Sequence, residues 1–118
     1  SWHVPSDEEW QSMEMFLGMS PSEASSAGWR GTDEGYQMKS TSGWDANGNG
    51  SNSSGFNGLP GGLCDSNDCR NFGYYGYWRS SSESGSYSWM RELGSYHDYV
   101  NRTNFNHDYG LSARCIKD

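Results

Sequence analysis

The sequence has 118 residues, with 8 basic side chains against 15 acidic ones and a net charge of −7. The Lys and Arg residues do not cluster, which excludes a surface that neutralises successive phosphates, so nucleic acid is not an expected partner. No apolar run reaches the roughly 18 residues that a membrane-spanning helix needs, so no membrane span is expected.

The aromatic residues indicate that the chain folds although it has few aliphatic side chains. Leu, Ile, Val and Phe together number 12, a fraction that is typical of disorder. Six Trp and eight Tyr, however, supply large apolar areas whose polar atoms can still find partners. We therefore expect a single domain over residues 1–118, with a ring-packed core and long polar loops.

The first predicted element is a helix that begins in "VPSDEEWQSMEMFLG". Ser6 can cap this helix, Glu9 completes a capping box, and Gly18 ends it. The apolar residues then fall on one predicted face, which we expect to pack on a sheet: Trp10, Met13, Phe16 and Leu17.

Two further helical segments are predicted before residue 43. Ser20 can cap the second, with Pro21 at its first position and Glu23 at its third. The stretch "TDEGYQMKS", residues 32–40, adds another helical turn or two.

The stretch "DANGNG", residues 45–50, matches the first half of a calcium-binding EF-hand loop. Asp45, Asn47 and Asn49 can offer oxygen ligands, and Gly50 permits the sharp turn. Phe56 stands where the loop needs its bidentate Glu, so a Ca²⁺ site would have another geometry. The alternative is a polar turn, because Gly and Asn tolerate left-handed backbone.

Candidate glycosylation sequons begin at Asn52 and Asn101. They would be acceptors only in a host that has the transferase, and a chain rich in Ser and Asn supplies such triplets by chance.

Three cysteines include a close pair in "LCDSNDC". Cys64 and Cys69 can form a disulfide if the protein is exported to an oxidising compartment, and the alternative is two reduced thiols on a loop. Cys115 is left without a partner.

Short aromatic runs between polar turns predict strands in the second half of the chain, at residues 74–80, 86–93, 98–103 and 111–116. Helices followed by an antiparallel sheet are typical of an α+β fold. Alternation along residues 87–92 places rings on one face of the sheet and mixed side chains on the other.

The predicted hairpin "GYYGYWRSSSESGSYSWMR" carries the candidate ligand-binding residues. Aromatic rings can stack on the C–H faces of sugars while Arg and Ser orient the hydroxyl groups. In a chain with so few aliphatic residues, the same rings can instead form the core. The candidates are Tyr75, Tyr77, Trp78, Arg79, Trp89 and Arg91.

The stretch "YHDYVNRTNFNHDYG" contains His-Asp-Tyr twice. A tight hairpin centred on Arg102 would bring His97 and His107 together, and with Asp98 and Asp108 they could bind zinc. A second register pairs residues 98–103 with 111–116 and separates the histidines. The loop composition of "NFNHDYG" favours this register, which leaves both histidines at solvent-facing edges.

Five stretches in one order resemble a bacterial family, the Fibrobacter succinogenes major paralogous domain: "WHVPSDEEW", "KSTSGW", "NGNGSNSSGFNGLPGG", "GYYGYWRSSSE" and "GLSARCIKD". They cover nearly the whole chain. The resemblance implies a C-type-lectin-like fold, in which two helices pack on a twisted antiparallel sheet and long loops display a binding surface. It also places the final strand at residues 110–115.

The family resemblance implies a secreted or cell-surface protein, often a lipoprotein or a module of a larger chain, without established catalytic activity. Family members usually carry Cys-Pro-x-Gly directly before Trp-His-Val-Pro. This sequence begins after that stretch, so we expect an excised piece that lacks its N-terminal strand and the partner of Cys115.

Two classes of function follow from these observations. The first is a non-catalytic extracellular module that binds a glycan or a protein ligand at the cell surface. The second is a structural domain that assembles with copies of itself into a surface layer or filament. No convergent set of acid, base and nucleophile is recognisable, so we do not expect an enzyme.

Overall fold

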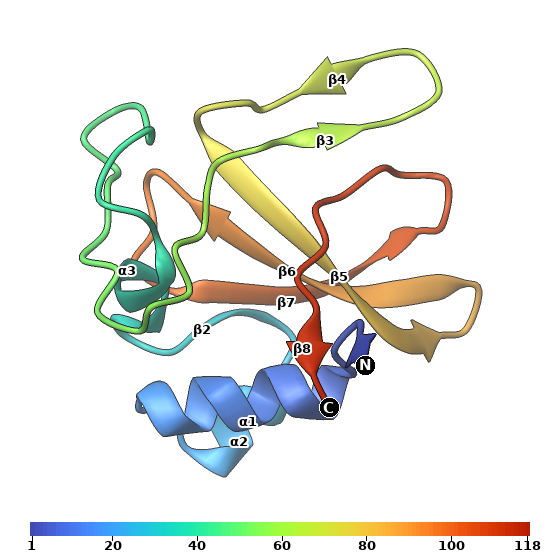
Figure 1. Ribbon diagram of the computed structural model, residues 1–118, viewed down its shortest axis with the longest axis horizontal. Helices are drawn as coiled ribbons and strands as arrows, with labels where there is room; N and C mark the ends of the chain where they lie inside the picture. Colours follow the sequence, from blue (N-terminus) through green and yellow to red (C-terminus); the bar gives the residue numbers. More distant parts are fainter.

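The computed structural model describes residues 1–118 and has a four-stranded antiparallel sheet at its centre (Figure 1). The strand order is β2-β7-β6-β5, with bounds Gly28–Arg30, Val100–Asn106, Tyr87–Gly94 and Tyr75–Ser84. Two small sheets pair β1 (Trp2–His3) with β8 (Ile116–Lys117), and β3 (Leu63–Cys64) with β4 (Cys69–Arg70). The predicted α+β class is therefore confirmed.

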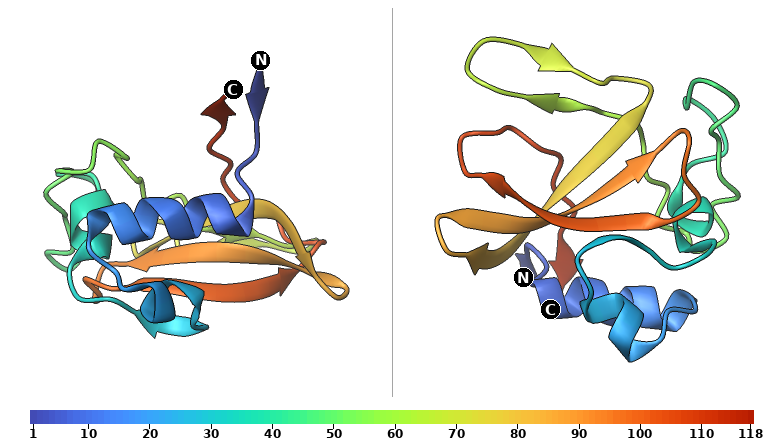
Figure 2. Two further views of the ribbon diagram at one scale, coloured as in Figure 1. Left: turned by 90° about the horizontal axis from the view of Figure 1, so that it is seen from below. Right: turned by 180° about the vertical axis from the view of Figure 1, so that it is seen from behind.

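Three helices accompany the sheet: α1 (Asp7–Leu17), α2 (Pro21–Ser25) and α3 (Glu34–Met38). Figure 2 shows α1 lying along one face of the central sheet. None of the three combines the length and the apolar composition that crossing a bilayer requires.

The predicted helix starts are confirmed. The Ser6 hydroxyl accepts a hydrogen bond from the Glu9 amide at 3.2 Å, and the Glu9 carboxylate accepts one from the Ser6 amide at 3.0 Å. Ser20 and Glu23 repeat this capping box at the start of α2. The boxes satisfy N–H groups that the helices leave free, so both starts are determined locally.

The predicted apolar face of α1 is only partly correct. Trp10 is buried, and Met13 and Leu17 are half-buried, but Phe16 is 90% exposed. The buried face instead follows Asp7, Trp10 and Glu14, which are spaced i, i+3 and i+7. The helix turns these two carboxylates inward because three arginines of the sheet receive them.

These five charged side chains form a buried ion-pair network between α1 and the sheet. Glu14 accepts from Arg30 at 2.6 Å and from Arg91 at 2.8 Å, and Asp7 accepts from Arg91 at 2.7 Å and from Arg102 at 2.8 Å. Burial alone would raise the pKa of Asp7, but hydrogen bonding from Arg102 and the charge of Arg91 outweigh it and lower that pKa.

The alternation of side chains along the central strands separates two apolar clusters. On the α1 face, Trp78 and Leu93 pack with the other rings and aliphatic side chains of the larger cluster: Trp10, Met19, Ala24, Met38, Trp44, Phe56 and Val100. On the opposite face, Tyr77 and Met90 pack with Leu63. The chain thus builds its core mainly from rings and methionines, as its composition predicts.

Three of the four predicted strands are confirmed with bounds shifted toward the C-terminus, and the fourth is wrong. Residues 111–115 are not part of a strand, Ile116 begins β8, and the segment does not pair with residues 98–103. Strand β7 pairs instead with β6 on one edge and β2 on the other. The Ser112 amide donates to the Tyr77 carbonyl at 3.0 Å, so the C-terminal segment follows the free edge of β5. The tight hairpin at Arg102 is also excluded, because Arg102 lies within β7.

Candidate functional site

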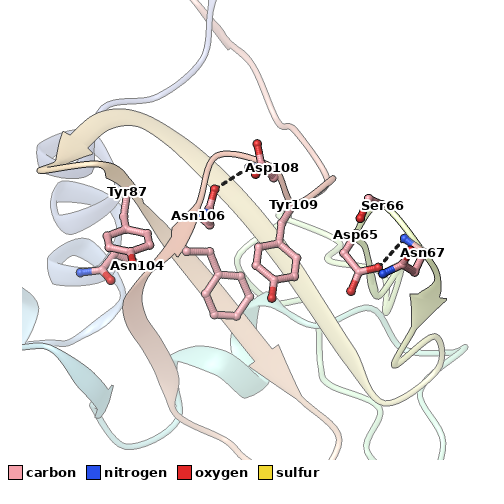
Figure 3. Close-up of a pocket in the computed structure, with 9 residues that line it drawn as sticks. Asp65, Ser66, Asn67, Tyr87, Asn104, Asn106, Asp108 and Tyr109 are labelled. Atoms are coloured by element: carbon pink, nitrogen blue, oxygen red, sulfur yellow. Dashed lines mark hydrogen bonds between the residues drawn. The ribbon is translucent and has the colours of Figure 1, made fainter.

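A surface groove of about 550 Å³ lies where the β3–β4 hairpin approaches the paired ends of β6 and β7 (Figure 3). We call it the hairpin groove and define it by its nine lining residues: Asp65, Ser66, Asn67, Tyr87, Asn104, Phe105, Asn106, Asp108 and Tyr109. In Figure 3, Tyr87 and Asn104 stand at one end, Asp65 and Asn67 at the other, and Tyr109 between them.

One wall of the groove is the disulfide hairpin. Cys64 and Cys69 form the predicted disulfide and face each other across β3 and β4. The Cys64 amide donates to the Gly110 carbonyl at 2.9 Å, and the Gly110 amide returns a bond to Cys64 at 2.6 Å. These bonds connect the hairpin to the loop that carries Asp108 and Tyr109, so the two walls hold each other in place.

Asp65 shapes the tip of this hairpin. Its carboxylate accepts from Arg70 at 2.6 Å and from the amides of Asn67 and Asp68 at 2.8 and 2.9 Å. The Arg70 bond, helped by the two amides, lowers the pKa of Asp65 to about 2. Asp65 is therefore charged at every physiological pH, and its hydrogen bonds stabilise the turn.

Rings form the apolar part of the groove. The Phe105 ring lies 5.2 Å from the Tyr109 ring and 5.8 Å from the buried Tyr77 ring, measured between centroids. Tyr87 is 45% exposed and adds a ring at the other end. Arg79 donates to the Tyr109 carbonyl at 2.6 Å and fixes the backbone there. The groove thus offers aromatic surface on a rigid support.

Amide and carboxylate groups supply the polar part. The Asn106 side-chain oxygen accepts from the Asp108 amide at 3.0 Å, which leaves the Asp108 carboxylate free of partners within the chain. Asn104 has only a long contact, 3.5 Å, to the Ser84 hydroxyl. Both nearby arginines are engaged, Arg70 by Asp65 and Arg79 by a carbonyl. The groove can therefore donate and accept hydrogen bonds, and it is biased against anions.

The structure divides the six predicted ligand-binding residues between the two faces of the sheet. Tyr75, Tyr77 and Arg79 point to the groove face, where Tyr77 is buried. Trp78 and Arg91 are buried on the α1 face. They are partners in the β5–β6 register, and alternate residues of a strand point to opposite faces.

Trp89 shares the α1 face with Arg91 and lies against Arg102, whose guanidinium is 3.9 Å from the Trp89 ring centroid. The six residues therefore do not form one surface, and most of them serve the core.

The predicted calcium ligands lie in a turn. Asn49 accepts a hydrogen bond from the Trp44 amide at 2.9 Å, and the Asp45 carbonyl accepts one from Gly48 at 3.0 Å. Ala46 and Asn47 adopt left-handed backbone, with φ of 55° and 58°. No cluster of three His, Cys, Asp or Glu side chains that could hold a metal ion occurs in the chain. Calcium binding at Asp45 remains a prediction.

The two predicted glycosylation sites differ in access. Asn52 is half-buried, and its side-chain oxygen accepts from the Asn57 amide at 2.7 Å. Asn101 is 9% exposed, and its side-chain nitrogen donates to Glu92 at 2.7 Å. A glycan would join this nitrogen, so glycosylation of Asn101 would require this hydrogen bond to break.

The two His-Asp-Tyr motifs lie at opposite ends of β7, so the histidines are far apart. His97 stacks on Trp29 with 3.8 Å between the ring centroids, and His107 is exposed in the turn after β7. The predicted separation is correct, although the predicted strand pairing behind it is wrong.

Cys115 is free and exposed.

Sequence reasoning missed most residues of the hairpin groove. The second His-Asp-Tyr motif was the available signal, because Asp108 and Tyr109 both line the groove. The proximity of the disulfide hairpin to this strand has no local signal, since it depends on the long-range contact between Cys64 and Gly110.

The sequence model of the family described as the Fibrobacter succinogenes major domain matches residues 1–117. No curated protein matches the chain, and no solved structure does. The resemblance predicted from five sequence stretches is therefore confirmed at the level of the family.

Proposed function

We propose that this chain, which belongs to the Fibrobacter succinogenes major domain family, is a non-catalytic extracellular module that binds glycans in the hairpin groove. The observation that carries the proposal is the combination of one exposed ring, Tyr87, and two half-buried rings, Phe105 and Tyr109, with unengaged amide and carboxylate groups on one rigid support. Rings stack on the C–H faces of a pyranose, and mixed donors and acceptors match its hydroxyl groups.

The rigidity of the groove favours binding. The disulfide, the two Cys64–Gly110 hydrogen bonds and the Arg79 contact to Tyr109 fix both walls before a ligand arrives. A preformed site loses little conformational entropy on binding, so a shallow polar groove can still reach useful affinity. Because Asp108 has no cationic partner and both nearby arginines are already engaged, we infer a preference for neutral sugars over uronic or sialic acids.

A C-type-lectin-like arrangement and an extracellular location belong to the same proposal. The antiparallel pairing of β1 with β8 and the long loops beyond α3 support that fold class. The Cys64–Cys69 disulfide supports export, because such bonds persist in oxidising compartments.

The chemistry of Asp65 supports a non-catalytic role for the groove. General acid–base catalysis works best when a pKa lies near the working pH. Asp65, with a pKa of about 2 and its oxygens engaged by Arg70 and two amides, is a poor acid and a weak base. A ligand would therefore be held and released unchanged.

The test is a glycan array followed by calorimetric titration with the strongest neutral hit. Tyr109→Ala and Asn104→Ala are expected to weaken binding at least tenfold, because they remove a stacking ring and an unengaged amide. Phe16→Ala is the matched control, because Phe16 is 90% exposed on α1 and does not line the groove. Equal affinity of all four proteins would contradict the proposal.

A second candidate, assembly with copies of the same chain, is favoured by large apolar side chains outside the groove. Phe16 is 90%, Phe72 80% and Trp2 66% exposed. Sedimentation velocity between about 1 and 500 µM would distinguish the two functions, because concentration-dependent growth without any glycan hit would favour assembly.

A further inference from the structure

A second pocket lies at the end of β6 opposite the hairpin groove. We call it the tyrosine pocket and define it by Tyr36, Lys39, Asn47, Asn49 and Asp98, which line a cavity of about 180 Å³ together with Gly48 and Ser95. Strand β6 runs from Tyr87, in the groove, to Gly94, next to the pocket. Seven residue steps of about 3.3 Å separate these ends by about 23 Å.

The pocket is built where three segments meet: α3, the turn at residues 45–50 and the β6–β7 turn (Figure 1). The buried Lys39 ammonium donates to the carbonyls of Gly94 and His97 at 2.9 and 3.0 Å, and the Tyr36 amide donates to the Asp98 carbonyl at 3.2 Å. These bonds join α3 to the β6–β7 turn.

Glycine permits the close contacts between these segments. A Cβ on Gly48 would lie 2.5 Å from the Ser95 Cα, and one on Gly35 would lie 2.3 Å from the Tyr99 carbonyl oxygen. No larger residue fits at either place without a shift of backbone. The glycines of "DANGNG" and of α3 therefore let both segments pack closely against the β6–β7 turn.

The polar groups of the tyrosine pocket are balanced in charge. Lys39 is 1% exposed and brings a positive charge to the pocket, while Asp98 brings an exposed carboxylate. The side chains of Asn47 and Asn49 add amide groups. The buried Lys39 charge lies beneath the pocket and offsets the charge of Asp98, so the pocket does not select an ion of either sign. A hydroxyl group, which both donates and accepts, suits this mixture.

One exposed tyrosine lines the pocket, and two more lie in the adjacent β6–β7 turn. Tyr36, which lines it, is 42% exposed, and Tyr99, next to Asp98, is 45% exposed. Tyr96, next to Ser95, is 67% exposed and stacks on Tyr74 with 6.2 Å between ring centroids. Solvent-facing rings beside a polar cavity are the combination that binds a pyranose from its C–H face.

We propose that the tyrosine pocket is a second and independent binding site for a neutral sugar residue, so that the domain is bivalent. The proposal goes beyond the hairpin groove, because it rests on other residues at the other end of the sheet. Two sites about 23 Å apart, at the ends of one rigid strand, can engage two chains of a polysaccharide or two places on one chain. Such linkage raises the overall avidity without any new contact.

The test is a ¹⁵N chemical-shift titration of the whole domain with three probes: methyl α-mannopyranoside, methyl β-glucopyranoside and methyl β-galactopyranoside. With at least one of them, the amides of Asn47, Gly48 and Asp98 are expected to shift saturably. Tyr36→Ala and Asn47→Gly are expected to weaken this binding at least tenfold. The glycine suits the left-handed backbone of Asn47, where φ is 58°, so the fold should be kept.

Tyr109→Ala is the matched control and separates this inference from the proposed function. Unchanged shifts at Asp98 in this variant would show that the two sites are independent. Saturable shifts confined to the hairpin groove would overturn the second site and leave the proposed function standing. Saturable shifts confined to Asp98 and Asn47 would overturn the proposed function of the hairpin groove and leave the second site standing. No saturable shift at the tyrosine pocket with any probe overturns the inference.

Discussion

At the scale of single residues, charge decides which side of α1 faces the sheet. Arg91 is fully buried and reaches both Asp7 and Glu14, and its guanidinium also lies 5.9 Å from the Trp10 ring centroid. Removing one partner of a buried pair leaves the others desolvated and unpaired. Removing one member of the network should therefore destabilise the fold more than replacing all five side chains by apolar ones.

Arg91→Met is accordingly expected to lower the free energy of unfolding by about 3–5 kcal/mol, because Asp7 and Glu14 each lose one of their two buried arginine partners. Urea unfolding followed by tryptophan fluorescence would measure this loss. Arg114→Met, at an exposed guanidinium, is the control and should cost under about 1 kcal/mol. A loss below 1 kcal/mol for Arg91→Met would show that water reaches the network.

At the scale of elements, α1 separates what sequence can predict from what it cannot. The capping box of Ser6 and Glu9 is a local pattern, and the helix begins where it predicts. The buried face is not local, since it depends on Arg30, Arg91 and Arg102 arriving from distant strands. An apolar stripe through Phe16 is a reasonable prediction until those arginines are placed.

Two substitutions on α1 measure this difference. Trp10→Ala should cost about 3–5 kcal/mol of unfolding free energy, because it removes a buried ring that packs on Phe56. Phe16→Ala should change it by less than about 0.5 kcal/mol, since the side chain is 90% exposed. Chemical denaturation of both variants measures these free energies. A larger loss for Phe16→Ala than the one expected here would support the apolar face predicted from sequence.

The β3–β4 hairpin allows a similar test of the candidate site. Replacing Cys64 and Cys69 by Ser opens a loop with a sequence separation of 5. Chain entropy for so short a loop predicts a loss of about 2 kcal/mol at most. The larger effect should be on the hairpin groove, whose wall would become mobile. Binding of the array hit should weaken at least fivefold in calorimetry while the protein stays folded, and full affinity would mean that the Gly110 bonds suffice.

At the scale of the whole molecule, the candidate sites depend on contacts that join distant parts of the chain. The two His-Asp-Tyr motifs are ten residues apart in sequence, and β7 carries them to opposite ends of the sheet. The first motif lies beside the turn at residues 45–50, and the second lies beside residues 65–67 of the β3–β4 hairpin. Sequence periodicity predicts the strands but not which loops meet at their ends.

The pairing of β1 with β8 brings the two ends of the chain together, and His3 lies between them. One ring nitrogen of His3 is 2.7 Å from Asp118, and the other is 2.9 Å from Glu9. Hydrogen bonding to Glu9, and then to Asp118, raises the pKa of His3 above its usual value of 6.5. A protonated His3 therefore holds α1 and β8 to one another.

The sign of the pH effect follows from this raised pKa. Stabilisation by His3 should be complete below about pH 6.5, where the residue is protonated in both folded and unfolded chains, and should fade as the pH rises through the folded pKa. Glu9 and Asp118 have lowered pKa values, so their share is lost only in acid, as the pH falls through those values. Thermal unfolding from pH 5 to 9 should show a fall in Tm that His3→Gln abolishes. A titration of the His3 ring protons with a pKa at or below 6.5, or an equal fall in the variant, would remove His3 as the cause.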